Sequence, residues 1–279
     1  MPDYKKIKAQ AETFFKQKQH AQAEAAYQKL FDEFENQCNR YDALHYVQAA
    51  KNQKKYKVAL DLCRRFYPNY RDFEPIRNLY AWSIYYTQLR NAADDAPPEQ
   101  IKKAALAVSR LSRPDDKYAP YNLSLLKAAE HKAFSSQDRI ELTDCLTPEH
   151  LSGKSFEFTG TDRRTIKYPS ELERFMVCRA KALQQAGRNK SAIQLIDEAF
   201  DTIKPFHLNN HLWLMRLKAK ALKAEGNTMQ ALETAERVAK QKPDWYLLKE
   251  LAEMQQAAGQ TEKALQTACK AALKHTPPD

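Results

Sequence analysis

The sequence is poor in the residues and patterns that build sheets, membrane spans and secreted frameworks. Only five of its 279 residues are glycine, and runs of alternating β-branched residues are nearly absent. Without such runs an extended sheet is not expected. No stretch of 18 apolar residues occurs anywhere, which argues against a membrane-spanning helix. Alanine, lysine, glutamine, glutamate and leucine are abundant instead, and they favour helix almost throughout.

The number and spacing of the cysteines indicate the cellular compartment. The number is odd, no pair has CxxC spacing, and the positions are scattered: Cys38, Cys63, Cys145, Cys178 and Cys269. Such cysteines are typical of reduced thiols inside the cell. The N-terminal segment MPDYKKIKAQAETFFKQ has no apolar signal core. We therefore expect a cytoplasmic protein.

What the chain does contain is a repeated stretch near its C-terminus. It reads KALQQAGRNKSAIQLIDEAF, then KALKAEGNTMQALETAERVA, then MQQAAGQTEKALQTACKAA. Successive glycines lie 39 and 33 residues apart, near the period of about 34 residues found in helix–turn–helix repeats. In each copy a glycine is followed five residues later by an alanine: Gly187 and Ala192, Gly226 and Ala231, Gly259 and Ala264.

Weaker copies of this unit fill the rest of the chain. Residues 4–37 and 40–71 show the same helical period, a third repeat is irregular and rich in aromatics, and a fourth is weaker still. Residues 146–170 break the pattern and contain the most strand-like residues, so they form a surface insertion or a small hairpin. We expect N-terminal repeats over 1–145, this insertion over 146–170, and C-terminal repeats over 171–279.

In these alanines and turn glycines, and in Tyr27 four residues after Ala23, the chain resembles the tetratricopeptide-repeat (TPR) superfamily. The resemblance covers a little over half of the chain. It implies an all-α fold, a right-handed α-solenoid of about seven antiparallel helix pairs with an irregular central insertion. It also implies that partners bind in a concave groove lined by the first helix of each pair. Such a resemblance predicts architecture well and the ligand poorly.

Motifs for catalysis, nucleotides and metals were weighed and set aside. The segment SGKS at 152–155 lacks the first glycine of a phosphate-binding loop, because Pro148 stands there. His207 and His211 are four residues apart but have no third ligand, and a helix start at Asn209 or Asn210 would leave His207 outside the helix. We expect no catalytic residue, no metal site and no cofactor.

The groove gives the stronger signal. Counting back from the turns places a set of cations and aromatics on the inner helices. They could hold an anionic ligand, although lysines are often a solvated face and aromatics are often core. The candidate partner-binding residues are Lys8, Lys51, Trp82, Tyr85, Arg174, Lys181, Arg216, Lys220 and Lys223.

The net charge of +10 permits an acidic partner. Our leading hypothesis is a non-catalytic scaffold or adaptor that binds a protein partner, with an acidic segment favoured, through this basic groove. The alternative is a module that binds RNA or single-stranded DNA on the same face. A third is a regulatory module for an enzyme domain that is missing from this chain. Separately, the last helix lacks the polar outer face of a cap, so we expect the chain to be the N-terminal part of a longer protein.

If Arg216 and Lys220 belong to an uncompensated cluster of like charges, changing both to glutamate should abolish binding and leave the melting temperature nearly unchanged. The sequence does not identify the partner or the oligomeric state.

Overall fold

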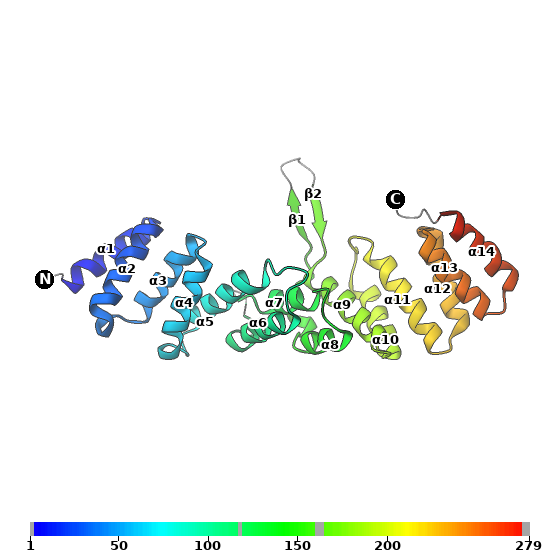
Figure 1. Ribbon diagram of the computed structural model, residues 1–279, viewed down its shortest axis with the longest axis horizontal. Helices are drawn as coiled ribbons and strands as arrows, with labels where there is room; N and C mark the ends of the chain where they lie inside the picture. Colours follow the sequence, from blue (N-terminus) through cyan, green and yellow to red (C-terminus); the bar gives the residue numbers. More distant parts are fainter. Residues whose placement is uncertain (1–2, 117–118, 160–164, 275–279) are drawn as a thin grey trace. The chain divides into compact units, whose positions relative to one another are not determined.

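The chain folds into stacked α-helices, as Figure 1 shows for a computed structural model. The structure describes residues 3–116, 119–159 and 165–274. It divides into two compact units, unit 1 over Met1–Ala133 and unit 2 over Phe134–Asp279. In both units each helix packs against the next one along the chain, which is how a repeat buries an apolar face that it cannot bury alone.

Unit 1 consists of helices joined by short turns. Its bounds are α1 (Tyr4–Lys16), α2 (His20–Phe34), α3 (Arg40–Asn52), α4 (Tyr56–Phe66), α5 (Glu74–Ile84), α6 (Pro98–Leu111) and α7 (Tyr121–Ala129). Short 3₁₀ turns follow α2 at Glu35–Gln37 and α4 at Tyr67–Asn69, and a π-helical turn at Tyr85–Leu89 continues α5.

Unit 2 contains the remaining helices and the hairpin. Its bounds are α8 (Ser136–Asp144), a 3₁₀ turn at Pro148–His150, β1 (Phe156–Thr159), β2 (Thr165–Tyr168), α9 (Glu171–Gln185), α10 (Asn189–Thr202), α11 (Asn210–Ala224), α12 (Thr228–Gln241), α13 (Trp245–Ala257) and α14 (Thr261–Lys274).

Five of the helix pairs share one turn geometry, in which a residue with positive φ ends the first helix. The amide of the residue that follows donates to a carbonyl five positions back, as Gln19 does to Phe14 and Asn227 does to Leu222. This bond satisfies one of the carbonyls that a helix end leaves without a partner. The turn residues are Lys18 and Lys54 in unit 1 and Gly187, Gly226 and Gly259 in unit 2.

The alanine that follows each turn by five residues is buried in every one of these pairs. Ala23, Ala59 and Ala192 are fully buried, and Ala231 and Ala264 are 1% and 5% exposed. A methyl group there lets the second helix approach the first closely, because a larger side chain would overpack the contact. The predicted burial of Ala192 and Ala231 is confirmed.

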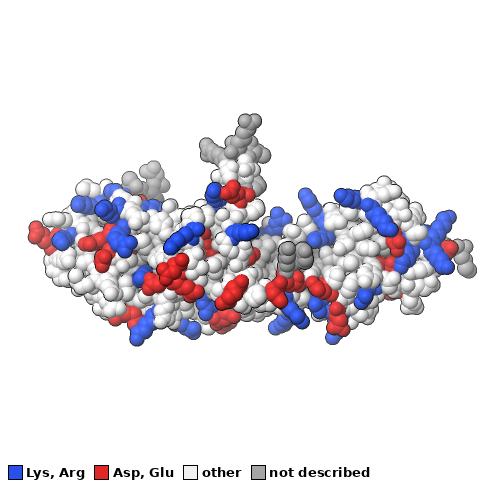
Figure 2. All heavy atoms as spheres, turned by 180° about the vertical axis from the view of Figure 1, so that it is seen from behind, with Lys and Arg blue, Asp and Glu red and all other residues white. Residues whose placement is uncertain are grey.

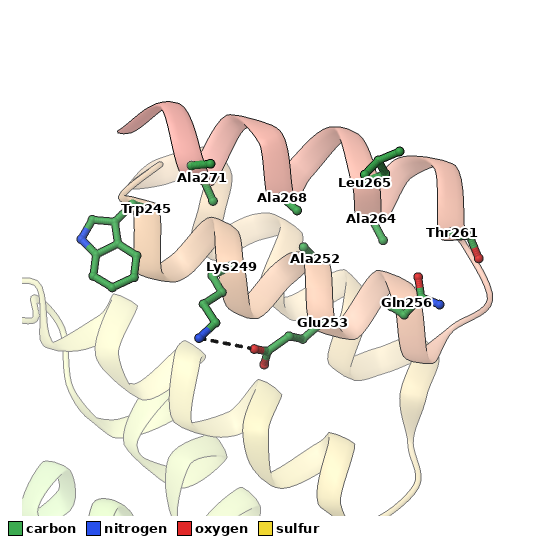
Figure 3. Close-up of a pocket in the computed structure, with 11 residues that line it drawn as sticks. Trp245, Lys249, Ala252, Glu253, Gln256, Thr261, Ala264, Leu265, Ala268 and Ala271 are labelled. Carbon is green, nitrogen blue, oxygen red and sulfur yellow. Dashed lines mark ion pairs between the residues drawn. The ribbon is translucent and has the colours of Figure 1, made fainter. Parts of the chain in front are cut away.

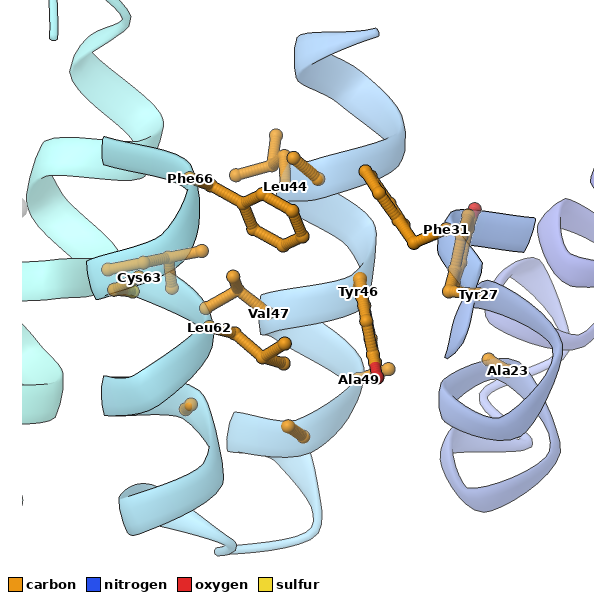
Figure 4. Packing of buried hydrophobic residues seen from close by; sticks show 14 of the residues in the cluster. Ala23, Tyr27, Phe31, Leu44, Tyr46, Val47, Ala49, Leu62, Cys63 and Phe66 are labelled. Atoms are coloured by element: carbon orange, nitrogen blue, oxygen red, sulfur yellow. The ribbon is translucent and has the colours of Figure 1, made fainter. Parts of the chain in front are cut away.

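The core of unit 1 is aromatic between α2, α3 and α4 (Figure 4). Phe31 of α2 stacks on Tyr46 of α3 at 5.8 Å between ring centroids and lies 4.6 Å from Phe66 of α4. Tyr27, one turn earlier on α2, is fully buried. The corresponding core of unit 2, between α11, α12, α13 and α14, consists of alanine, leucine and methionine.

The central insertion forms a two-stranded antiparallel hairpin, which stands out from the helices of unit 2 in Figure 1. Phe156 pairs with Tyr168, and their exposed fractions are 63% and 42%. All of β2 is exposed, so the hairpin is not pinned to the helices by apolar burial. The DRR segment of the insertion, residues 162–164, lies outside the described residues.

The prediction of an all-α fold of helix pairs is confirmed, and of the two forms expected for the insertion the structure has the small hairpin. The described residues contain 14 α-helices and one two-stranded sheet. The two helices of the fourth repeat, which is weak in the sequence, belong to different units. Helix α7 packs against α6 in unit 1, and helix α8 packs against α9 in unit 2.

Candidate functional site

The site begins with two cations of α11 that share one carboxylate of α13. Arg216 donates from Nε and from one terminal nitrogen to Glu250, at 2.7 Å and 2.6 Å. Lys220, one turn further along α11, lies 2.8 Å from the same carboxylate. The fork geometry of arginine on a carboxylate makes this a strong, directional pair. The exposed fractions are 29% for the Arg216 side chain and 20% for Glu250.

The charges of this group stabilise one another. Burial alone would raise the pKa of Glu250, but hydrogen bonds from Arg216 and Lys220 outweigh it and lower that pKa below its ordinary value. The hydrogen bond to Glu250 raises the pKa of Arg216 in turn. Glu250 and Arg216 therefore remain ionised near neutral pH, and the one carboxylate is shared by two basic side chains.

Two aromatic rings flank the arginine. Trp213 and Tyr246 stack nearly parallel at 6.3 Å, and the guanidinium of Arg216 lies 5.7 Å and 5.3 Å from their centroids. Lys242 approaches Trp213 at 5.0 Å. Cations at these distances are attracted by the negative face of the ring. The two rings thus add a second set of contacts that restrict the position of Arg216.

Two further cations, Lys181 and Lys223, lie near Lys220 in the register of the inner helices. Lys181 of α9 and Lys220 of α11 both lie six residues before their turn glycine, and Lys223 follows three residues after Lys220. Lys181 and Lys223 are exposed, and neither forms an ion pair with any described residue. Because α9 packs directly against α11, equivalent positions on the two helices face the same side. Arg174 lies in the first turn of α9, partly buried.

Unit 1 contains a related pair. Lys8 of α1 lies 2.9 Å from Asp42 of α3, and that carboxylate is 2% exposed. Burial would lower the pKa of Lys8, but hydrogen bonds to Asp42 and Tyr4 outweigh it and raise the pKa. Asp42 also accepts from the backbone amide of Asn39 at 2.9 Å, so it caps α3 at the same time. Lys8 is therefore fastened to the fold.

Of the two aromatic candidates of unit 1, Trp82 belongs to a stack of rings and Tyr85 does not. Lys51 lies 5.7 Å from the ring of Trp82, which stacks on Tyr86 at 5.4 Å, and Tyr86 stacks on Tyr56 at 4.3 Å. Burial lowers the pKa of Lys51. Tyr85 is only 8% exposed and meets Trp82 edge-on. The ring of Tyr85 thus belongs to the core and offers little surface to a ligand.

The main pairs of both units connect residues 34 positions apart, Lys8 with Asp42 and Arg216 with Glu250. Each pair joins the first helices of two consecutive repeats. This geometry revises one expectation from the sequence, the uncompensated cluster at Arg216 and Lys220. Changing both to glutamate would leave Glu250 half-buried among like charges, so we now expect that variant to melt at a lower temperature.

Charges are mixed over the wider surface as well. On the face drawn in Figure 2, lysine and arginine side chains are interspersed with aspartate and glutamate. The face drawn there carries no patch of a single sign, so the candidate site depends on local pairing and its excess of cations.

The two motifs set aside above, residues 152–155 and the pair His207 and His211, have no arrangement that would bind a nucleotide or a metal among the described residues. The segment 152–155 is an exposed loop that leads into β1, with no helix after it to form a phosphate-binding loop. His207 precedes α11, as predicted, and its Nδ1 lies 2.7 Å from Glu173, whose side chain is fully buried. Within the described ranges no three His, Cys, Asp or Glu side chains are grouped to hold a metal ion. Every helix there is too short or too polar to cross a lipid bilayer.

Comparison with known proteins gives similarity in fold. No family model matches the chain, and no curated protein matches it in sequence. Among solved structures it is similar to a tetratricopeptide repeat protein from Parabacteroides merdae, with 13% identity, 98% of this chain and 93% of that chain covered, and a TM-score of 0.39. A Rap protein complexed with competence and sporulation factor has 11% identity, coverages of 98% and 78%, and a TM-score of 0.43.

The TPR2AB domain of yeast Sti1 in its pHSP90 complex has 13% identity, coverages of 97% and 90%, and a TM-score of 0.32. Solved structures of tetratricopeptide repeat proteins are thus among those to which the chain is similar. At these identities and TM-scores the likeness carries no argument about function, and the site has to be argued from this chain's own residues.

Sequence reasoning missed three residues of the site. Glu250, Trp213 and Tyr246 surround Arg216, but two of them lie on α13, about one repeat further along the chain. A usable signal was the 34-residue spacing, which places an acid of one repeat beside a base of the preceding one.

Proposed function

We propose that the chain is a non-catalytic interaction module that binds an acidic segment of a partner protein on the inner face of unit 2. The observation that carries the proposal is the sharing of one carboxylate, Glu250, by Arg216 and Lys220. Glu250 holds both cations in place, and the group of three side chains has one positive charge in excess. A bound carboxylate would meet donors that are already positioned, which lowers the entropy cost of binding.

The neighbouring cations extend this excess. Lys181 and Lys223 have no ion-pair partner among the described residues, and the register of the repeats predicts inner-face positions for both. An acidic peptide that crosses α9 and α11 would place its carboxylates near both lysines and near Arg216. Such charges at the rim mainly increase the rate of association and select the sign of the partner.

The experiment uses a fluorescein-labelled peptide rich in glutamate and aspartate, titrated into the full chain and followed by anisotropy. The test variant is Lys181→Glu with Lys223→Glu, because both side chains are exposed and neither forms an ion pair with a described residue. We expect affinity to fall by about tenfold or more, equivalent to roughly 1.4 kcal/mol. The matched control is Lys190→Glu with Lys240→Glu, two exposed lysines on the second helices α10 and α12.

Equal losses in the test and control variants would show a general charge effect and contradict the proposed surface. No loss in either would also contradict it. Circular dichroism of each variant checks that helicity is retained.

A second candidate function is favoured by the stack in unit 1. The rings of Tyr56, Tyr86 and Trp82 lie beside Lys51, and Arg90 approaches Tyr86 at 5.4 Å. Cations interleaved with rings suit single-stranded RNA or DNA. A labelled oligo(U) titrated at several salt concentrations tests it: nucleic-acid binding should show a log–log slope near −0.7 for each phosphate contacted, and Trp82→Ala should weaken it.

A further inference from the structure

The last helix pair of unit 2 carries an open apolar groove that the proposed function does not use. The groove runs between α13 and α14 and has a volume of about 850 Å³ (Figure 3). Its floor is made of alanines, including Ala252, Ala264, Ala268 and Ala271, and Leu265 and Trp245 form part of its walls. Lys249 and Glu253, 4.0 Å apart, lie at its edge.

The preceding repeat contains the same groove in a covered form. The turn glycines Gly226 and Gly259 are 33 residues apart, so each lining residue has an equivalent 33 positions earlier. Leu265 corresponds to Leu232, Ala268 to Ala235 and Ala272 to Ala239. Those three equivalents belong to α12, and α13 packs on them in one apolar cluster.

Equivalent residues of the two grooves differ in how much of their surface is exposed. Leu232 is 3% exposed, whereas Leu265 is 66% exposed. Ala235 and Ala239 are buried under α13, and Ala268 and Ala272 are exposed. Among the described residues no helix covers α14 as α13 covers α12. Exposed apolar side chains gathered in one groove are the kind of surface that an apolar partner can cover.

The covered copy also shows which ligand fits. Helix α13 contributes Leu248, Leu251 and Met254, spaced three residues apart, to the cluster with Leu232. It places Glu250 toward the two cations at the edge of the groove, Arg216 and Lys220. The occupant of this groove type is therefore an amphipathic helix, and its apolar residues recur at i, i+3 and i+6.

We infer that the groove between α13 and α14 binds an amphipathic α-helix of another protein, in the arrangement in which α13 covers α12. The argument is the continuity of a repeat interface that the fold already uses. Two substitutions adapt the open copy. Ala271 replaces Val238, which makes the floor deeper, and Trp245 replaces Leu212, which adds a wall. At the edge of the open groove, Lys249 and Glu253 stand at the positions that Arg216 and Lys220 occupy in the covered copy. Because these two side chains carry opposite charges, the bound helix needs no acid at the position equivalent to Glu250.

The probe for this inference is a peptide with the sequence of residues 242–258, which contains α13, labelled with fluorescein and titrated into the full chain. We expect saturable binding. Leu265→Glu should weaken it by more than about tenfold, because a carboxylate would be buried in the apolar contact. Leu273→Glu is the matched control, since Leu273 lies on the same helix, is 89% exposed and does not line the groove.

Three results would overturn the inference. The first is no saturable binding of the peptide. The second is binding that Leu265→Glu leaves unchanged, which would mean that the peptide displaces α13 from α12. The third is a dimer of the chain in sedimentation that Leu265→Glu abolishes, which would assign the groove to a second copy. A peptide with Leu248→Glu and Leu251→Glu must fail to bind.

This surface is independent of the acidic-peptide site. Leu265 does not belong to the inner face that carries Lys181 and Lys223, so Leu265→Glu should leave binding of the acidic peptide unchanged. Failure of one proposal therefore leaves the other to be judged by its own titration.

Discussion

The two units solve the same structural problem with different residues. In unit 1 the turns between paired helices are made by Lys18 and Lys54, at φ values of 59° and 61°. In unit 2 the same hydrogen-bonded turn is made by glycines, with φ between 74° and 81°. A side chain in the left-handed region is strained, and glycine is not. The packing of the helix pair thus sets the turn geometry. The residue at the turn determines only how much backbone strain that geometry imposes.

The ion pairs between first helices differ in a related way. Unit 1 uses a buried acid, Asp42, that serves one lysine and also caps α3. Unit 2 uses a more exposed acid, Glu250, that serves two cations and leaves a positive excess. We interpret the first pair as structural and the second as structural and open to a ligand.

The largest expected effect tests that contrast. Asp42→Ala should lower the free energy of unfolding by about 3 kcal/mol, since it removes a cap and leaves Lys8 without its buried partner. Glu250→Ala should cost about 1 kcal/mol, because its cations reach solvent. Urea unfolding of the full chain, followed by circular dichroism, measures both. If the two costs are equal, the distinction between a buried and a shared acid is wrong.

Next in size are the alanines after the turns. Ala59→Leu in unit 1, and Ala192→Leu or Ala231→Leu in unit 2, should each cost about 1–3 kcal/mol by overpacking the helix pair. Lys57→Leu and Glu233→Leu are the controls, because these residues lie exposed on the same helices as Ala59 and Ala231. Thermal melts that match the wild type for any of the three alanine variants would show that this contact is not tight in that unit.

A smaller effect concerns pH and the buried thiol of unit 1. Burial raises the pKa of Cys63 from 9.0 to about 12, so its contribution to stability is complete below pH 9 and is lost as pH rises towards 12. Between pH 8 and pH 10 the wild type should lose about 1 kcal/mol more than Cys63→Ala. Cys269→Ala, at an exposed position of α14, controls for the loss of a thiol. Identical pH dependence in wild type and Cys63→Ala would contradict this expectation.

The smallest effect sharpens the comparison of the turns. Lys54→Gly should stabilise unit 1 by about 0.5–1 kcal/mol through relief of strain, less what glycine costs in the unfolded chain. Gly226→Ala should destabilise unit 2 by about 1 kcal/mol, and the cause is the backbone alone, since an added Cβ would meet no atom within 4 Å. Urea midpoints of both variants decide it. A change of the same sign in both would mean that the two turns are not equivalent.

Much of the fold could be predicted from the sequence. The glycine and the alanine five residues later locate a turn and a buried contact because both depend on residues of one helix pair. The Lys18 and Lys54 turns were harder to predict, since lysine has no preference for positive φ and only the packed pair imposes it. The hairpin was expected from its strand-like residues, but its exposure depends on what lies beside it.

The candidate site was predictable in part, for the same reason. Helical period by itself determined which side chains share a face of one helix, and so it placed Arg216, Lys220 and Lys223 together. It could not determine which neighbour meets that face. Only the stacking of α13 on α11 brought Glu250 to Arg216, and only the lack of a described helix over α14 left Leu265 exposed. Periodicity is a property of one element, whereas pairing and exposure are properties of the contact between elements.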